Sequence, residues 1–438
     1  MSNNNSKNIN IGLIGFGYIA SCVYRLIYEQ NDYIASKIER RLRITRIADK
    51  DPGRLNSDLP GLSSVSLSND AKHILEDDDI DIVVELIGGI VPAYDFVSRA
   101  LEKGKYVVTA NKDLIANKGQ KLFEIAHRTN VDILFEASVC GGIPIIGPLK
   151  SSLASNKISK IAGVVNGTTN YILTRMEKEG LSFSDALCMA QELGYAEKDP
   201  SADIEGYDAA CKLAILSSIA FNSRVVMDDV YREGITSVKA ADINNALEMG
   251  YRIKLLAIGR EQDGRITAKV HPALVPKGHI LASIEDTYNA VYVYGNYVDE
   301  VMSYGRGAGD RPTASSVVGD IIKIARNYDS QKKGPIYGCS CFENKQIKHI
   351  DEDISKFYLL MDVADRPGVL AKIARVFGDN SVSIESMIQK QADKEGTARL
   401  IFITHEVVNK DLYQSIGQVS NLDVVNKVLS AIRVEDLD

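Results

Sequence analysis

The chain has 438 residues, more than one hydrophobic core normally holds, and this length predicts about two to four domains. Apolar residues make up 45% and charged residues 25% of the chain, as in ordinary globular proteins. The formal net charge of -7 and the lack of long basic runs argue against a nucleic-acid-binding protein.

Six cysteines are scattered along the chain without a CxxC pair, and the six histidines have no metal-ligand spacing. Reduced thiols and a cytoplasmic location are therefore expected. No apolar run approaches the roughly 20 residues that cross a bilayer, so neither a secretory signal nor a membrane span is predicted.

Residues 1–139 alternate apolar strands with helical patterns, which is typical of a parallel, doubly wound α/β sheet of the Rossmann type. Strands are expected at residues 9–17, 41–49, 80–89, 105–112 and 131–139. Helices are expected between them, at residues 92–104 and 113–130.

Residues 140–312 mix helices with a mainly antiparallel sheet and predict a second, α+β domain. Helices are expected at residues 144–155, 182–193 and 205–221, and strands at residues 265–276 and 289–305. A helix at 313–328 would return to the first domain, and the polar, turn-rich segment 329–354 is predicted to be a linker. Residues 355–438 follow a βαββα pattern, the beginning of a small ferredoxin-like module, which is expected to be separable from the rest.

The stretch "GFGYIA" (15–20) matches G-x-G-x-x-G/A directly after a strand and before a helix. Gly15 permits a tight turn, and Gly17 has no side chain to block a pyrophosphate at the helix N-terminus. Phe16, Tyr18 and Ile19 complete the expected nucleotide loop. The alternative is a tight turn without a ligand.

Polar residues follow the next strands of the predicted sheet. Asp49 ends the second strand, where a carboxylate accepts hydrogen bonds from the ribose 2′-OH of NAD, whereas the nearby Lys50 and Arg54 could accommodate the 2′-phosphate of NADP. Ligands bind beyond the carboxyl ends of such strands, so further residues should line the cofactor crevice: Gly88, Gly89, Thr109, Asn111 and Lys112. A solvated strand-end aspartate and a surface lysine are the alternatives.

The stretch "FEASVCGGIPII" (135–146) begins as a strand and ends in a Gly-Gly turn. Irregular backbone there can turn carbonyl groups inward, and together with Glu136 they could ring a hard cation. On pattern alone, an interdomain hinge is the stronger interpretation.

The stretch "GYAEKDPSADIEGYDAACKLAIL" (194–216) crowds acidic residues before an apolar helix. Asp208 and Lys212 are four residues apart and share a helix face. A lysine held among carboxylates can act as a general acid or base, and the carboxylates, among them Glu197 and Asp203, can bind an ammonium group. An ordinary surface ion pair is the alternative.

This acidic segment resembles the signature of homoserine dehydrogenases. So do "GLIGFG", "VVELIGG", "VTANK", "FEASVCGGIPII", "GVVNGTTNYI" and "GRGAGDRPTASSVVGD", in the family's order over about residues 9–328. The resemblance implies an enzyme that interconverts L-homoserine and L-aspartate 4-semialdehyde with NAD or NADP, in threonine and methionine biosynthesis. The rival functions are a different amino-acid dehydrogenase on the same scaffold and a non-enzymatic nucleotide and amino-acid sensor.

The resemblance also implies roles for single residues. Lys212 matches the catalytic lysine and Lys112 a second active-site lysine near the nicotinamide, while Glu197 and Asp208 match carboxylates that bind homoserine. Gly194 and Gly307 match cofactor-side glycines. The residues that match a sodium site are Glu136, Val139, Gly141 and Ile143. Tyr18, Ala20 and Cys140 depart from the family's usual residues.

The tail "VADRPGVLAKIARVFGDNSVSIESMIQ" resembles an ACT domain. In that family an amino acid binds between paired modules, near the turn that holds Asp365 and Gly368 here. The resemblance implies threonine feedback on a monofunctional enzyme, assembled as a homodimer or homotetramer.

Overall fold

The computed structural model describes residues 8–51, 53, 59–328, 333–391 and 396–437. The chain forms two compact units, each discontinuous in sequence. The first unit comprises Met1–Ser159, Ala214–Met227 and Asn289–Asn344, and the second comprises Lys160–Leu213, Asp228–Tyr288 and Lys345–Asp438. The expected domain boundaries at residues 139/140 and 354/355 differ from this division and stay a prediction.

The first unit contains a parallel six-stranded sheet in the order β3-β2-β1-β4-β5-β6. Its strands are β1 (Ile9–Ile14), β2 (Leu42–Ala48), β3 (Ser66–Ser68), β4 (Ile82–Glu85), β5 (Tyr106–Thr109) and β6 (Ile133–Leu134). The strand order reverses between β1 and β4, and ligands bind at such a switch point in open α/β sheets. The Rossmann-type prediction is confirmed.

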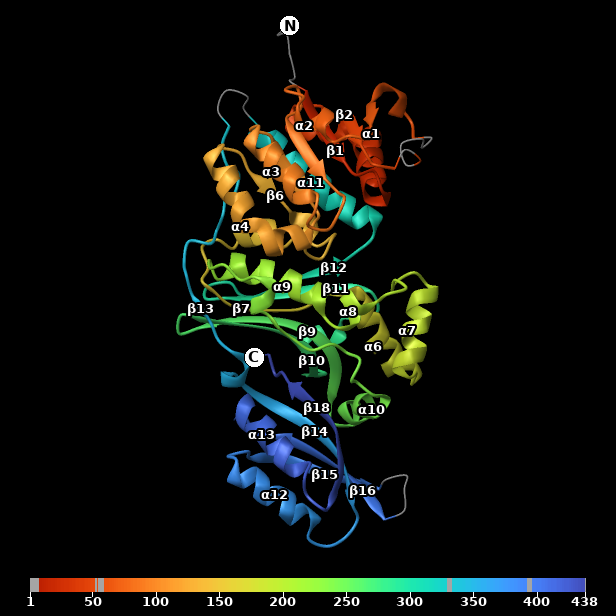
Figure 1. Cartoon of the computed structure of the whole chain (residues 1–438), viewed down its shortest axis with the longest axis vertical. Coiled ribbons are helices and arrows are strands. Elements are labelled where there is room, and N and C mark those ends of the chain that lie inside the picture. The colour runs from red at the N-terminus through yellow and green to blue at the C-terminus, as the bar shows by residue number, and fades with distance from the viewer. Residues whose placement is uncertain (1–7, 52, 54–58, 329–332, 392–395, 438) are drawn as a thin grey trace. The chain divides into compact units, whose positions relative to one another are not determined.

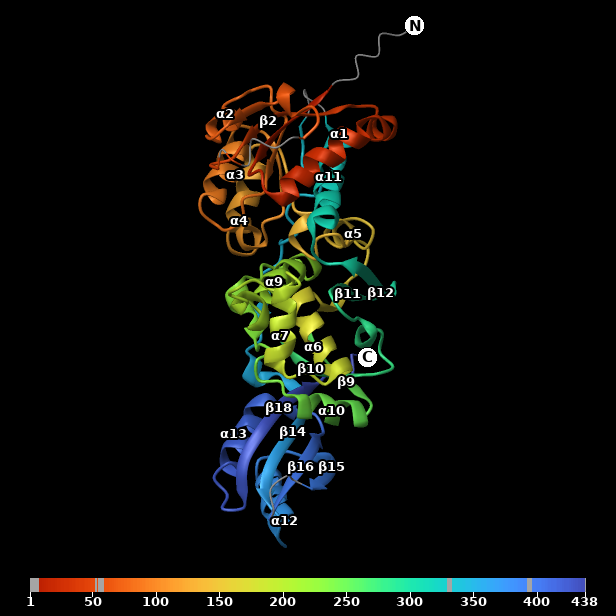
Figure 2. The ribbon, with the colours of Figure 1, turned by 90° about the vertical axis from the view of Figure 1, so that its right-hand side faces the viewer.

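Helices accompany this sheet (Figure 1). They are α1 (Tyr18–Ile38), α2 (Lys72–Leu75), α3 (Ala93–Glu102), α4 (Lys112–Arg128) and α11 (Asp310–Asn327), with the 3-10 turn η1 (Leu62–Ser64). The helix expected at 313–328 is α11, and it packs along α1, as Figures 1 and 2 show from two sides. The chain therefore returns to the first unit late in the sequence.

The rest of the first unit corrects two expectations. Its elements are η2 (Glu136–Ser138), α5 (Ile146–Lys150), β11 (Tyr288–Gly295) and β12 (Asp299–Arg306). The helix predicted at 144–155 is only α5, because the following Ser and Asn residues favour turns. The strand predicted at 289–305 is two strands, since Asn156 accepts from the N–H groups of Tyr297 and Val298 and fixes a turn there.

The segment predicted as a linker is anchored where the structure describes it. One carboxylate oxygen of Asp132 accepts from the N–H groups of Ile336, Tyr337 and Gly338, at 2.8–3.0 Å. Lys150 donates to the carbonyl of Gly338 at 2.7 Å. This part of the chain is therefore fastened to the first unit rather than free.

The second unit contains a longer, mainly antiparallel sheet in the order β7-β9-β10-β18-β14-β16-β15. The strands are β7 (Ile158–Val164), β9 (Tyr251–Gln262), β10 (Arg265–Pro276), β14 (Ile354–Ala364), β15 (Ile384–Gln391), β16 (Thr397–Thr404) and β18 (Val425–Val434). Three short strands pair at its sides: β8 (Tyr231–Arg232), β13 (Gln346–Ile347) and β17 (Val407–Val408).

The first four helices of the second unit are α6 (Gly167–Glu179), α7 (Phe183–Glu192), α8 (Ser201–Ile204) and α9 (Tyr207–Ala220). The C-terminal end of α9 belongs to the first unit. The others are α10 (Ala240–Glu248), α12 (Val369–Asp379) and α13 (Asn409–Val419), with the 3-10 turns η3 (Met227–Asp229), η4 (Ile280–Ser283) and η5 (Ile350–Glu352).

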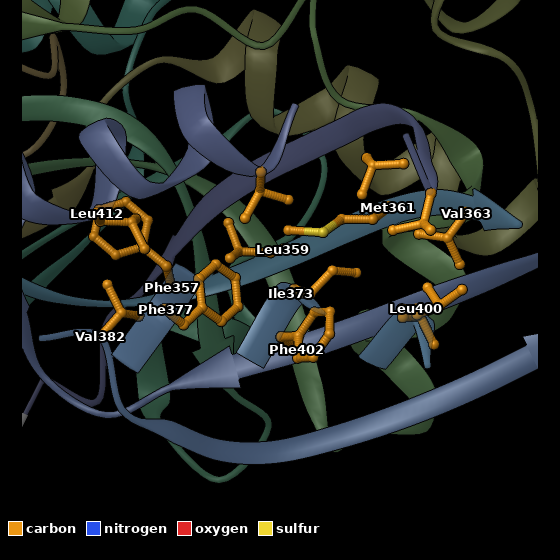
Figure 3. Close-up of a cluster of buried hydrophobic side chains, with 14 of the residues drawn as sticks. Phe357, Leu359, Met361, Val363, Ile373, Phe377, Val382, Leu400, Phe402 and Leu412 are labelled. Atoms are coloured by element: carbon orange, nitrogen blue, oxygen red, sulfur yellow. The ribbon is translucent and has the colours of Figure 1, made fainter. Parts of the chain in front are cut away.

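The C-terminal module has the order βαββαβ, with strands arranged β18-β14-β16-β15, and confirms the ferredoxin-like prediction. Its last strand, β18, was not predicted. Figure 3 shows the core between helices and sheet, where Phe357, Phe377 and Phe402 are fully buried. Each such side chain contributes about 1.5–3 kcal/mol through burial.

The module is not a separate body. β18 pairs in parallel with β10, in register Ala273↔Arg433 and Leu274↔Val434, so one sheet runs from the middle of the chain into the module. The expectation of a separable module therefore does not fit the structure, because cutting it away would expose the edge of β10.

Candidate active site

The predicted nucleotide loop follows β1 in the first unit. Gly15 has a φ of +90°, and a Cβ there would lie 2.6 Å from Ile87 and 3.0 Å from the carbonyl oxygen of Leu86, so only glycine fits. Gly17 is the N-cap of α1 and supplies no side chain to the helix N-terminus. The first turn of α1 holds no acidic residue, and its N–H groups point at the place where an anion can bind.

The other residues of the loop point in different directions. Phe16 is buried, Ile19 is half-buried, and the ring of Tyr18 is 82% exposed. The bulky Tyr18 therefore turns away from the loop backbone, and Ala20, 1% exposed, packs where the family motif often has glycine. These positions fit a pyrophosphate site.

Asp49 follows β2 and is bound to the nucleotide loop. Its Oδ2 accepts from the N–H of Phe16 at 2.6 Å, and its Oδ1 accepts from the N–H of Asp51 at 2.9 Å. The residue is only 6% exposed. Asp49 thus fixes the shape of the loop besides carrying a negative charge. Lys50 is exposed, and Arg54 lies outside the described residues.

A buried carboxylate that sequence reasoning did not assign organises the next two strand ends. Glu85 at the end of β4 is 0% exposed and accepts from the N–H groups of Ile87 and Gly88 and from the hydroxyl of Thr109, at 2.8, 3.2 and 2.6 Å. The only signal was its place in "ELIGG". Asn111 donates to the carbonyl of Gly89 at 2.6 Å.

Both glycines at these strand ends are exposed, and the lysine is half-buried. Gly88 and Gly89 have φ values of +73° and +67°, and nothing lies within 4 Å of a Cβ built on either. Lys112 is the first residue of α4, after the N-cap Asn111. A cation is disfavoured at a helix N-terminus, so Lys112 does not serve the helix itself.

The carboxylate of Glu136 is fully occupied by protein donors. Its Oε1 accepts from the N–H groups of Ile145 and Ile146, both at 2.7 Å, and its Oε2 accepts from Gly147 and Lys323 at 2.8 and 3.1 Å. Four donors already use the side-chain oxygens, and a cation at this position stays a prediction. Only main-chain oxygens of the loop are left for that purpose.

The loop that follows Glu136 is buried and irregular. Cys140 and Gly141 have φ values of +52° and +37°, which turn the backbone sharply between Val139 and Ile143. Val139 and Ile143 are 0% and 1% exposed. Carbonyl oxygens in such a loop have the chemistry that Na⁺ prefers, so the main chain fits a hard cation.

Gly307 approaches the same loop closely. A Cβ on Gly141 would lie 2.7 Å from the carbonyl oxygen of Gly307, and one on Gly307 would overlap the amide of Asn289. Gly141 therefore requires glycine because two stretches of backbone touch there, and Gly307 because the side chain of Asn289 fills the space.

The polar cluster predicted to bind substrate, called the substrate cluster below, lies in the second unit and centres on Asn166, which sequence reasoning did not assign. Its Nδ2 donates to Oδ1 of Asp203 at 2.6 Å and to Oδ2 of Asp208 at 2.8 Å. Its Oδ1 accepts from the N–H and hydroxyl of Thr169, at 2.8 and 2.9 Å, and so caps α6. An asparagine at the helix start in "VVNGTT" was the available signal.

Lys212 joins this cluster from α9. Its Nζ donates to Oδ2 of Asp208 and to the carbonyl oxygen of Val165, both at 2.7 Å, and the side chain is 11% exposed. The pKa of Asp203 is raised, mainly by burial and further by the charge of Asp208. With all three groups ionised, two carboxylates and one ammonium carry a net negative charge.

The remaining predicted residues of this segment are exposed. Glu197 lies in the loop after α7, and its carbonyl accepts from the amide of Gln191 at 2.9 Å. Gly194, with a φ of +75°, ends that helix in the second unit, whereas the nucleotide loop belongs to the first. The structure thus brings Asp203, Asp208 and Lys212 together and leaves Glu197 outside their hydrogen bonds.

The predicted effector turn lies between β14 and α12. Gly368 has a φ of +89° and is the N-cap of α12, without a side-chain cap. Asp365 is exposed, and Gln389 donates to its carboxylate at 3.4 Å. The free N–H groups at this helix start can receive a carboxylate.

Clustered metal-ligating side chains and membrane-spanning helices are both absent from the described residues. The described residues hold no group of three or more His, Cys, Asp or Glu side chains arranged for a metal ion, and all six cysteines are free thiols. Among the helices of the described ranges, none has both the length and the apolar composition needed to cross a bilayer.

Three family models match the chain. One described as "Homoserine dehydrogenase, NAD binding domain" matches residues 15–136, one described as "Homoserine dehydrogenase" matches residues 144–322, and one described as "ACT domain" matches residues 357–423.

Similar proteins carry the same description. A curated homoserine dehydrogenase of Corynebacterium glutamicum is 43% identical over 432 residues, which span 98% of this chain and 96% of the relative. The crystal structure of a homoserine dehydrogenase from Thiobacillus denitrificans has a TM-score of 0.93 at 38% identity and covers 99% of both chains. A hyperthermophilic archaeal homoserine dehydrogenase in complex with NADPH has a TM-score of 0.62 at 30% identity and covers 74% of this chain and 99% of its own.

Proposed function

Because the chain belongs to the homoserine dehydrogenase family of oxidoreductases, we propose that it interconverts L-homoserine and L-aspartate 4-semialdehyde with NAD or NADP, as a step of amino-acid biosynthesis. The observation that carries this proposal is the hydrogen-bonded network of Asp203, Asn166, Asp208 and Lys212, which would join a proton-transfer group to a site for an ammonium group.

Lys212 is the proposed proton carrier. The neutral amine takes the proton of the substrate hydroxyl in oxidation, and the ammonium gives a proton to the aldehyde oxygen in reduction. Its two contacts, to Asp208 and the carbonyl of Val165, use two of the three N–H donors and aim the third. Lys112 is proposed as the second lysine near the reacting atoms.

The carboxylates hold the substrate's ammonium group. Asp203 and Asp208 share the Asn166 amide, so their separation is set before substrate arrives, and their net negative charge attracts a cation. Glu197, exposed on the neighbouring loop, is proposed as a third carboxylate for the same group.

The nucleotide site belongs to the first unit. A bound nicotinamide cofactor supplies the hydride acceptor in oxidation and the donor in reduction. The glycines at 15 and 17 and the N-terminus of α1 would receive its pyrophosphate, and Gly88, Thr109 and Gly307 are proposed to line the rest of its site. A cofactor role for Gly194, which lies in the second unit, stays a prediction. The negative charge of Asp49 is proposed to favour NAD over NADP.

A monovalent cation is proposed to bind the main-chain oxygens of Glu136, Val139, Gly141 and Ile143. The support is the pair of positive φ values at Cys140 and Gly141 and the burial of the loop. Replacing Na⁺ by N-methylglucamine should lower the melting temperature of the protein. An unchanged melting temperature across this exchange would remove the cation from the proposal.

Regulation, assembly and location complete the proposal. Threonine is proposed to bind the C-terminal module near Asp365 and Gly368, and the enzyme is proposed to be a homodimer or homotetramer, which light scattering would measure. Six free cysteines fit the reducing cytoplasm, which is the proposed location.

A nicotinamide absorbance assay tests the reaction directly. Purified protein is mixed with NAD or NADP and a panel of hydroxy amino acids, among them L-homoserine, L-serine and L-threonine. Reduction of the nucleotide with L-homoserine alone is expected. Preference for another member of the panel would make the protein a different amino-acid dehydrogenase, and no reduction with any of them would contradict the proposal.

A further inference from the structure

Arg433 is a buried charge near the end of the chain. It lies on β18 with 1% of its surface exposed. Its Nη1 donates to Oε1 of Glu233 at 2.6 Å, and its Nη2 donates to the hydroxyl of Tyr413 on α13 at 3.3 Å. A buried guanidinium is tolerated only with a charged partner, so Glu233 and Arg433 depend on each other.

Glu233 follows β8 and connects the module to β10. Its N–H donates to the carbonyl of Val270 at 2.8 Å, and its carboxylate accepts from the hydroxyl of Tyr231. Burial alone would raise the pKa of Glu233, but the charge of Arg433, the neighbouring His271 and the hydrogen bonds from Arg433 and Tyr231 together hold that pKa below its ordinary value. Both partners are therefore ionised at neutral pH.

The residues on either side of Glu233 lie directly against the segment between α8 and α9. The N–H of Ile235 donates to the carbonyl oxygen of Ile204 at 2.8 Å. A Cβ on Gly234 would lie 2.3 Å from that same oxygen, so the two backbones touch. The guanidinium of Arg232 lies 3.5 Å above the ring centre of Tyr207.

This segment, residues 204–207, joins the two carboxylates of the substrate cluster. Asp203 precedes it and Asp208 follows it, and both accept from the one amide of Asn166. A displacement of residues 204–207 must therefore change the separation of Asp203 and Asp208 or break one of these hydrogen bonds.

We propose that Glu233, held by Arg433 of the C-terminal module, is a positioning residue that sets the spacing of the substrate-binding carboxylates. The inference rests on the proposed function of Asp203 and Asp208. It follows that any ligand that shifts β18 changes the affinity for the amino-acid substrate, and that substrate binding changes the affinity for that ligand by the same factor.

The test compares Michaelis constants of the full-length enzyme for its two substrates. Glu233→Gln removes the charge and keeps the shape. It should raise KM for L-homoserine about tenfold or more, while KM for the nucleotide stays within about twofold. Arg433→Met should do the same, because either change leaves the other charge, buried in Arg433 and half-buried in Glu233, without its charged partner. The double variant has lost both charges, so neither is left without a partner. Its KM for L-homoserine should therefore be no higher than that of either single variant.

The control variant is Arg375→Gln, which removes an exposed ion pair to Asp379, of 3.8 Å, in the same module. It should leave both Michaelis constants unchanged. A melting curve of every variant shows whether it folds. If a neutral variant does not fold, it is replaced by Glu233→Asp or Arg433→Lys, which keep the charges. Both are expected to raise KM for L-homoserine only, by less than the neutral variants do.

Two outcomes would overturn the inference: a KM for L-homoserine that does not change in the folded Glu233 and Arg433 variants, or an equal rise in both Michaelis constants. The wild-type enzyme in the same experiment tests the proposed function separately, since failure of wild type to oxidise L-homoserine would refute the reaction and, with it, the substrate role on which the inference depends.

Discussion

Nζ of Lys212 lies 2.7 Å from Oδ2 of Asp208, one turn earlier on α9, and both side chains are buried. A solvated ion pair at this spacing contributes little to stability, but this pair is held in place by two further contacts, from Asn166 to Asp208 and from Lys212 to the carbonyl of Val165. The arrangement gives the ammonium a fixed direction, which is what a proton carrier needs.

We expect Lys212→Ala and Lys212→Arg to lower kcat by about 10²–10⁴-fold, the usual contribution of a general acid or base. Arginine keeps the charge but cannot give up its proton, so it separates proton transfer from charge. The nucleotide Kd, measured by fluorescence, should not change. Lys198→Ala, at an exposed lysine of the preceding loop, is the control. An arginine variant within threefold of wild type would remove proton transfer from the role of Lys212.

Asp49→Asn should raise the ratio of kcat/KM for NADP to that for NAD. The amide still offers an oxygen to the N–H of Phe16, so the loop is kept while the charge that repels a 2′-phosphate is lost. Asp49→Ala, which also loses that hydrogen bond, should weaken binding of both nucleotides. If the ratio stays constant in Asp49→Asn, the carboxylate shapes the loop and does not select the nucleotide.

Glu435→Gln should destabilise the fold at neutral pH by up to about 3–5 kcal/mol, because the buried Lys269 loses one of its two carboxylate partners and keeps Asp353. Oε1 of Glu435 lies 2.8 Å from Nζ of Lys269 and 3.3 Å from Nε2 of His271. Burial alone would raise the pKa of Glu435, but the charge of Lys269 and the neighbouring His271 hold it well below its ordinary value.

The sign of the pH dependence follows from that lowered pKa. The contribution of Glu435 is fully present above the unfolded pKa of about 4.5 and is lost as pH falls towards the lower folded value. Urea unfolding of wild type and Glu435→Gln should therefore converge below about pH 4.5. A free-energy difference that does not depend on pH would show that the carboxylate charge is not the source.

Threonine should inhibit the full-length enzyme, and Asp365→Asn should raise the threonine concentration that gives half inhibition by about tenfold, or about 1.4 kcal/mol of binding energy. Asp379→Asn, which changes an exposed aspartate in the same module, is the control. Activity and calorimetry are followed together. Equal inhibition of both variants and wild type would place threonine elsewhere.

We expect that a chain truncated before residue 345 cannot be used to test threonine inhibition, because it should not fold. The truncated chain lacks Arg433, the partner of the half-buried Glu233, and Glu435, a partner of the buried Lys269. We expect it to unfold or aggregate, as size-exclusion chromatography would reveal. A soluble, active truncated enzyme would mean that the catalytic part tolerates the loss of β18.

Most of the regular elements were predictable because strands and helices leave their periods in the sequence. "GFGYIA" after an apolar run predicts the β1–α1 turn, and Asp208 and Lys212 at a spacing of four predict a shared helix face, since both depend on neighbours in the chain. The length of helix α5 was overestimated, because the apolar pattern was followed past Lys150 into Ser and Asn residues that favour turns.

What tertiary structure alone decided are the long-range partners. Glu136 looked like a cation ligand in sequence, yet the chain returns N–H groups nine to eleven residues later that occupy its carboxylate. Asn166 became the centre of the substrate cluster only because β7 and α6 bring it to α9, and the pair Glu233–Arg433 spans 200 residues. A sequence pattern records whether a side chain is buried. The distant charged residue that pairs with a buried side chain depends on how sheets and helices pack, and that packing is set by the whole chain.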